Sequence, residues 1–196
     1  MIWDIGALIA AIIAAVSGLA SSYIATKSSR SLKILEEKFH KEKETNSFRE
    51  KQLSCLYFPM HVHLTLTQAM FKRFFEKGTS ELEKENIEHT WKHYNDKMFS
   101  ILVESSTYLD LDSPKEVTEE LMEHILQWNI VYKMKYVDKI HKGPVFSGTS
   151  QFGFRGFPKG KKVYSNEKTG NEGVDGYFKD KTNSLRKTLH DRITPP

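Results

Sequence analysis

The chain has 196 residues, of which 29 are Lys or Arg and 25 are Asp or Glu, so its formal net charge is +4 with histidine neutral. A charge this small does not by itself identify a nucleic-acid partner. The single cysteine, Cys55, excludes an intrachain disulfide and agrees with a body in a reducing compartment. The length beyond the N-terminal segment suffices for one domain of ordinary size.

The N-terminal segment from Ile5 to Ala25 carries no charge and no proline. As a helix rising about 1.5 Å per residue, it would extend roughly 30 Å, which is the thickness of the hydrocarbon core of a bilayer. We therefore predict a transmembrane anchor within residues 1–26. Lys27, Arg30 and Lys33 follow it, and basic flanks stay in the cytoplasm. This predicts a single-pass protein of the bacterial inner membrane, with the N-terminus outside and the C-terminal domain cytoplasmic.

The alternative for this segment is a cleaved secretory signal, with small residues near Ala20 to Ser22 as the cleavage site. A secretory signal carries its basic residues before the apolar core, whereas here they come after it. An embedded, uncleaved helix is therefore the favoured interpretation.

Small residues recur at every fourth position along the predicted span. Because steps of four keep residues near one face of a helix, they form a stripe that a second helix can approach closely. We predict that the span packs through this stripe against a copy of itself or a partner. The alternative is an alanine-rich anchor whose small residues have no role. The predicted packing residues are Gly6, Ala10, Ala14, Gly18 and Ser22.

Residues 27–52 are rich in Lys and Glu with sparse apolar positions, which indicates a charged juxtamembrane helix. The apolar positions Leu32, Leu35 and Phe39 follow a weak heptad-like pattern that turns polar further along the chain. A solvated stalk is therefore favoured over a stable coiled coil.

Residues 53–196 are predicted to form a cytoplasmic helical bundle. Apolar residues recur at helical spacing in four segments. These predicted helices run from Leu53 to Phe75, from Glu81 to Leu109, from Ser113 to about His141 and from Val174 to Ile193. Helices of this length with short connections favour antiparallel packing, so the predicted fold class is all-α.

Local signals predict several helix ends. Pro59 is expected to kink its helix or to begin a fresh one. Gly78 is expected to close that helix, and Ser80 to cap the next. Ser113 followed by Pro114 is a further predicted start, with a capping hydroxyl before a proline at the first helical position.

Residues 143–176 hold most of the glycines and follow no sustained period, so we predict a loop with at most a short hairpin. Basic and aromatic side chains alternate in it. Such side chains neutralise phosphates and stack on bases of single-stranded DNA or RNA, or lie on anionic lipid headgroups. The favoured alternative is that the rings tuck onto the bundle or contact a protein. The candidate contact residues are Phe152, Phe154, Arg155, Phe157, Lys159, Lys161, Lys162 and Tyr164.

The sequence contains no convergent set of catalytic residues. His89 and His93 lie four apart on a predicted helix, but the HExxH pattern and a further ligand are lacking. Cys55 is expected to be a small buried hydrophobic residue. No GxSxG, phosphate-loop or dinucleotide fingerprint occurs. We therefore expect a protein that is not an enzyme, with no catalytic residues, no metal and no cofactor.

The segment LYFPM, from Leu56 to Met60, follows an apolar N-terminal segment and a basic stretch at Arg49 to Gln52. In this order, these features resemble small bacterial membrane proteins encoded beside phage-defence modules, including the transmembrane effectors of retrons. The resemblance implies an antiviral toxin that damages the inner membrane when released from an inhibitory complex. That complex would contain a reverse transcriptase and its RNA-linked single-stranded DNA. Some proteins of that group have two spans, whereas one is predicted here.

The sequence therefore favours a membrane-anchored, non-enzymatic effector that acts as an oligomer through its span. The alternative is a passive membrane adaptor that docks a cytosolic protein or nucleoprotein through the helical bundle. A third hypothesis is nucleic-acid binding through the loop of residues 143–176.

Overall fold

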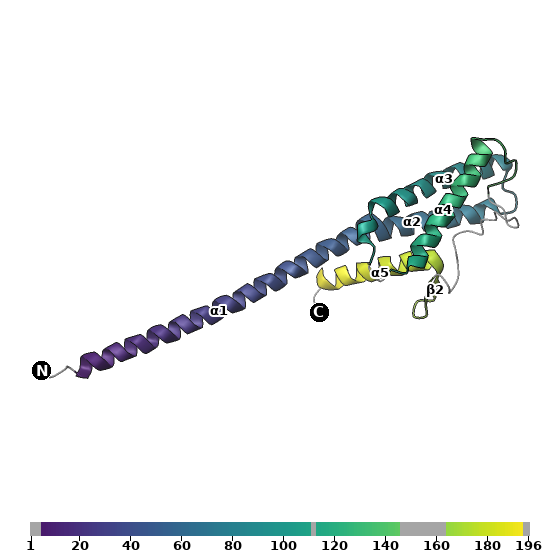
Figure 1. Cartoon of the computed structure of the whole chain (residues 1–196). Coiled ribbons are helices and arrows are strands. Elements are labelled where there is room, and N and C mark those ends of the chain that lie inside the picture. Colours follow the sequence, from purple (N-terminus) through teal and green to yellow (C-terminus); the bar gives the residue numbers. More distant parts are fainter. Residues whose placement is uncertain (1–4, 111–112, 146–163, 194–196) are drawn as a thin grey trace. The chain divides into compact units, whose positions relative to one another are not determined.

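The computed structural model describes residues 5–110, 113–145 and 164–193, and it is mostly helical, as predicted (Figure 1). The helices are α1 (Ile5–Lys51), α2 (Phe58–Phe74), α3 (Glu81–Glu104), α4 (Lys115–Tyr136) and α5 (Gly173–Ile193). A π-helix, η1 (Gln52–Tyr57), joins α1 to α2, and a 3-10 helix, η2 (Ser106–Tyr108), follows α3. The chain divides into two compact units, residues 1–47 and residues 48–196.

The described part of the first unit is α1 up to Ser47, and the last turn of α1 belongs to the second unit. The charged segment of residues 27–52 is helical as predicted, up to Lys51 in α1. Every described side chain from Ala25 to Thr45 is exposed, including the heptad-like positions Leu32, Leu35 and Phe39.

The predicted transmembrane helix is not supported by the structure. Within the described part of the chain, no helix combines the length and the apolar character that crossing a membrane requires. The side chains of the predicted packing residues Gly6, Ala10 and Ala14 lie outside the described residues, whereas Gly18 and Ser22 are described and exposed.

The second unit is built around a core between α2, α3, α4 and α5. Helix α2 packs against α3 and α5, and α4 also packs against α3 and α5, so each of the four helices has two helical neighbours. The centre holds large side chains with no exposed surface, among them Trp91, Trp128 and Phe178. The indole rings of Trp91 in α3 and Trp128 in α4 stack with 6.4 Å between their centroids. The apolar stripes read from the sequence thus supply the core.

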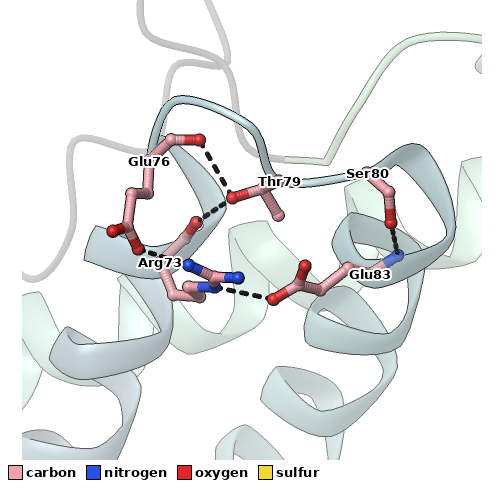
Figure 2. Close-up of polar contacts among 5 residues, drawn as sticks. All are labelled: Arg73, Glu76, Thr79, Ser80 and Glu83. Carbon is pink, nitrogen blue, oxygen red and sulfur yellow. Dashed lines mark hydrogen bonds and ion pairs between the residues drawn. The ribbon is translucent and has the colours of Figure 1, made fainter.

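The turn between α2 and α3 sets these helices antiparallel (Figure 2). Ser80 Oγ accepts a hydrogen bond from the N–H of Glu83 at 3.2 Å, which confirms the predicted N-cap. The Thr79 hydroxyl lies 2.8 Å from the carbonyl oxygen of Arg73 and 2.9 Å from that of Glu76. The Arg73 guanidinium donates to the carboxylates of Glu76 and Glu83 at 2.7 and 2.6 Å. One side chain therefore ties the end of α2 to the start of α3.

Gly78 closes this turn with a φ of 97°, in the left-handed region that glycine adopts without strain. Helix α2 itself ends at Phe74, with Phe75 at its C-cap, so Gly78 lies in the turn beyond the helix end rather than at the end, where the sequence predicts it. Helix α3 is shorter than predicted. It ends at Glu104 rather than Leu109, and η2 occupies part of the difference.

The predicted cap at Ser113 is wrong. Helix α4 begins at Lys115, Pro114 occupies the N-cap position, and no side chain caps the first turn. The Ser113 hydroxyl instead lies 2.6 Å from that of Tyr177 in α5. The Ser113 hydroxyl therefore contacts Tyr177 in another helix instead of capping α4.

The end of α4 also differs from the prediction, because the helix stops at Tyr136 rather than near His141. The N–H groups of Ile140 and His141 both donate back to the carbonyl oxygen of Met134, at 3.0 and 3.1 Å. Lys139 adopts a φ of 56° within this turn. The helix is thus closed by a left-handed turn before Gly143 is reached.

The short hairpin allowed by the sequence is present. Strands β1 (Ser165–Asn166) and β2 (Asn171–Glu172) pair antiparallel immediately before α5. Helix α5 agrees closely with the prediction, since it runs from Gly173 to Ile193.

Candidate functional site at the π-helix junction

The backbone of η1 accommodates Pro59 without breaking the helix. The N–H of Phe58 donates to the carbonyl oxygen of Leu53, five residues back, which is the π-helical pattern. Pro59 has no N–H, so in a regular α-helix the Cys55 carbonyl would lose its donor. The Ser105 hydroxyl, at the end of α3, donates to that carbonyl at 3.1 Å. The predicted kink or fresh start takes the form of a π-helix leading into α2.

Cys55 is exposed, so its predicted burial is wrong. The side of η1 that faces the core is occupied by Gln52, Leu56 and Tyr57, all of which are buried. Cys55 directly precedes Leu56 and Tyr57 in the sequence but lies on the exposed side of η1.

Gln52, the residue that follows α1, makes polar contacts with the connection after α3. Its side chain is only 3% exposed. Its Nε2 donates to the carbonyl oxygen of Tyr108 at 2.9 Å and to Asp110 Oδ1 at 2.7 Å. The second carboxylate oxygen of Asp110 accepts from Lys181 Nζ in α5 at 2.6 Å. Asp110 therefore joins η1 to α5 through the connection that follows α3.

The Asp110 carboxylate is ionised in this setting. Burial alone would raise its pKa, but the hydrogen bonds from Lys181 and Gln52 outweigh burial and hold the pKa of Asp110 below its ordinary value. The pair with Lys181 is about one-third exposed on both sides, so solvent screens part of its strength.

A second set of contacts between η1 and α5 is made by hydroxyl groups. The Tyr57 and Tyr177 hydroxyls lie 3.4 Å apart, and the Tyr57 hydroxyl accepts from the N–H of Asp110 at 3.3 Å. The Ser113 hydroxyl completes the group through its contact with Tyr177. Burial raises the pKa of both tyrosines, so both phenols are neutral at physiological pH. We call Gln52, Tyr57, Asp110, Ser113, Tyr177 and Lys181 the junction.

The chemistry of the junction suits coupling rather than catalysis. Its carboxylate is already engaged by two donors, and its phenols are held neutral, so these groups do not form an activated nucleophile with a free base. The junction links three parts of the bundle through charged and neutral hydrogen bonds. These parts are η1, the residues Asp110 and Ser113 before α4, and helix α5.

Most of the sequence-predicted contact residues in the loop lie outside the described residues. These are Phe152, Phe154, Arg155, Phe157, Lys159, Lys161 and Lys162. Tyr164 is described and partly buried. Its hydroxyl donates to Asp180 at 2.9 Å, and its ring meets that of Tyr177 edge-on at 5.3 Å. At this one position, the ring packs onto the bundle.

Two carboxylates that the sequence analysis missed hold the chain on either side of residues 146–163. Glu88 in α3 is 1% exposed and accepts from the Val145 N–H at 2.6 Å, from Tyr136 at 2.6 Å and from Lys135 at 2.5 Å. Asp180 in α5 accepts from four side chains of the hairpin region. These are Tyr164, Asn166, Thr169 and Asn171.

His89 and His93, the pair considered for metal binding, both contact aromatic side chains. His89 Nδ1 lies 2.6 Å from the Tyr132 hydroxyl, and the rings of His93 and Tyr94 are in contact. In residues 5–110, 113–145 and 164–193, no three or more His, Cys, Asp or Glu side chains gather in a group that could hold a metal ion.

Comparison with known proteins adds no family to this picture. No protein-family model, no curated protein and no solved structure matches the chain.

Proposed function

We propose that the protein is a membrane-anchored, non-enzymatic effector of the bacterial inner membrane. Residues 1–26 form a single-pass span with its N-terminus outside, and the helical bundle is cytoplasmic. Spans associate through Gly6, Ala10, Ala14, Gly18 and Ser22 when an inhibitory partner releases the protein, and the assembly perturbs the membrane. The uncharged run from Ile5 to Ala25 and its small-residue stripe support this proposal.

The observation that carries the proposal is that Gln52 is buried and hydrogen-bonded within the bundle. This buried residue directly follows α1, the helix that begins in the apolar segment at Ile5, and it is bonded within the junction. A partner that binds the bundle better in one arrangement of the junction than in another would bias the helix leading into it. The resemblance to retron effectors supports a nucleoprotein with RNA-linked single-stranded DNA as that partner.

The test is expression of the full chain in bacteria without a partner. Gly6, Ala10, Ala14 and Gly18 are replaced together by leucine, which preserves apolar character but removes the close approach of two helices. The matched control places leucine at Ile9, Ile12 and Val16, off the stripe. We expect the wild type and the control to arrest growth and release small dyes, and the stripe variant to remain in the membrane fraction without doing either.

A second candidate function is a passive adaptor, favoured by the exposed stretch from Ala25 to Thr45, which suits a spacer between a membrane and a docked protein. An exchange of residues 1–26 for an unrelated apolar span separates the two functions. An adaptor keeps its function after the exchange, whereas the effector loses toxicity. Full toxicity with the unrelated span would remove the stripe from the mechanism.

A further inference from the structure

The outward face of α4 has exposed apolar side chains at its centre. Leu126 and Ile130 are 47% and 59% exposed, although both are large and apolar. The opposite face of α4 faces the core through residues such as Leu121 and Trp128, which are fully buried. Single exposed apolar residues are ordinary on protein surfaces, so this pair needs a further pattern before it indicates an interface.

That pattern is a heptad repeat along the outward face. The six positions are spaced alternately four and three residues apart, as on the contact face of a paired helix. All six are exposed. They are Glu119, Glu123, Leu126, Ile130 and Lys133 in α4 and Val137 at its C-cap, which together we call the α4 seam.

The order of charges along the α4 seam selects the direction of pairing. The acids lie at its N-terminal end and Lys133 at the other. A parallel second copy would place acid against acid and Lys133 against Lys133, which is repulsive. An antiparallel copy that sets Leu126 opposite Ile130 also sets Glu123 opposite Lys133, because both pairs are symmetric about the same point. The twofold axis repeats each contact, giving two ion pairs around an apolar centre.

The charged groups of this pairing are Glu123 and Lys133, both exposed. Glu123 accepts one hydrogen bond from Gln127 on its own helix, at 2.7 Å. Neither Glu123 nor Lys133 forms an ion pair within the described part of the chain. Their charges can therefore pair with Lys133 and Glu123 of an antiparallel second copy.

We propose that the α4 seam is a self-association site that takes the α4 seam of a second copy of this chain, antiparallel. One helix pair buries less than a standard stable interface, so the contact is weak between free chains. The pairing itself does not depend on the span, so it extends the proposed function without resting on it.

The first experiment locates the contact by cross-linking. Two full-length chains are co-expressed, both with Cys55→Ser so that no native thiol interferes. One carries Leu126→Cys and the other Ile130→Cys, and a short bis-maleimide is added. We expect the mixed product to exceed either homodimeric product severalfold. A dominant link between two copies of position 126 would indicate parallel pairing and overturn the proposal, as would the absence of any link.

The second experiment tests the charges. Glu123→Lys and Lys133→Glu are each expected to lower the mixed cross-link about tenfold, because each replaces two attractive pairs by two repulsive ones. The double variant restores the pairs in reverse and should restore the cross-link, which a folding defect would not do. Glu120→Lys makes the same change at an exposed position off the seam and serves as the control.

The outcomes distinguish this proposal from the proposed function. Cross-linking that follows the charge pattern supports the α4 seam even if the chain is recovered outside the membrane fraction. Failure of the double variant to restore the product overturns the antiparallel contact, whatever the toxicity of the chain. The mixed cross-link could also form only after residues 146–163 are deleted. That result would mean that the chain covers its own α4 seam, and it would overturn the proposal.

Discussion

Helix α1 between Ala25 and Thr45 and helix α2 are both helical, but they bury very different amounts of side chain. Every described side chain of the first stretch is exposed, whereas α2 buries Met60, Leu64 and Phe74. Most helical stability in proteins comes from packing an apolar face, so α2 is held by the bundle. The stretch of α1 has local support from contacts such as that between His40 and Glu44 at 3.4 Å. Tertiary packing therefore supports α2, whereas the stretch from Ala25 to Thr45 buries no described side chain.

The largest contrast is expected from removing one phenylalanine ring in each unit. Phe178→Ala empties a fully buried position and should lower the free energy of unfolding by about 3–5 kcal/mol. Phe39→Ala removes a ring that is 64% exposed and should change it by less than about 0.5 kcal/mol. Urea unfolding followed by tryptophan fluorescence measures both, since Trp91 and Trp128 lie in the core. Equal effects would show that α1 is packed after all.

A smaller contrast is expected between a buried and an exposed carboxylate. Glu88→Gln keeps the shape but removes the charge that faces Lys135 and the Val145 N–H, and should cost about 1–3 kcal/mol. Glu83→Gln alters an ion pair with Arg73 in which both side chains are more than one-third exposed. It should therefore cost less than about 1 kcal/mol. The same unfolding measurement ranks them. A larger loss for Glu83→Gln would contradict the assignment of Glu88 as the structural carboxylate.

The smallest effect at neutral pH, growing with acidity, is expected from His124 in α4. Burial lowers the pKa of His124 to about 4, against 6.5 in an unfolded chain. The unfolded state therefore binds more protons between these values, so stability is full above pH 6.5 and falls as the pH drops toward 4. The loss would reach about 3 kcal/mol. The pKa values of His61 and His63 are lowered in the same direction.

His124→Gln removes this titration. The unfolding midpoint of the variant should fall less than that of the wild type between pH 7 and pH 4.5. Parallel pH profiles for the two proteins would show that the pKa of His124 is the same in the folded and the unfolded chain, contrary to the shift described here.

The elements that the sequence predicted well are those with a strong local cause. Four apolar patterns at helical spacing define the bundle, and Ser80 caps α3 because the hydroxyl and the N–H of Glu83 are neighbours in sequence. Ser113 shows where such reasoning ends. The same type of signal was overridden by Tyr177, 64 residues away, whose hydroxyl competes for the serine.

The junction could not be predicted for the same reason. Pro59 signals a disturbed helix, but the donor that satisfies the Cys55 carbonyl is Ser105, which lies 50 residues away at the end of α3. Glu88 lies in a charged stretch and resembles a solvated residue until Val145 and Tyr136 are seen to reach it. The predicted basic-aromatic contact site lies largely outside the described residues, and its one described member, Tyr164, is packed against α5.

The exposure of Cys55 gives the chain a native labelling position. It is the only cysteine and lies within η1, between the buried residues Gln52 and Leu56. A maleimide dye added to the unaltered protein would therefore attach at one point, beside the hydrogen bond that Ser105 makes to the same residue. Its emission would report rearrangement of η1 in intact cells or vesicles, without any engineered substitution.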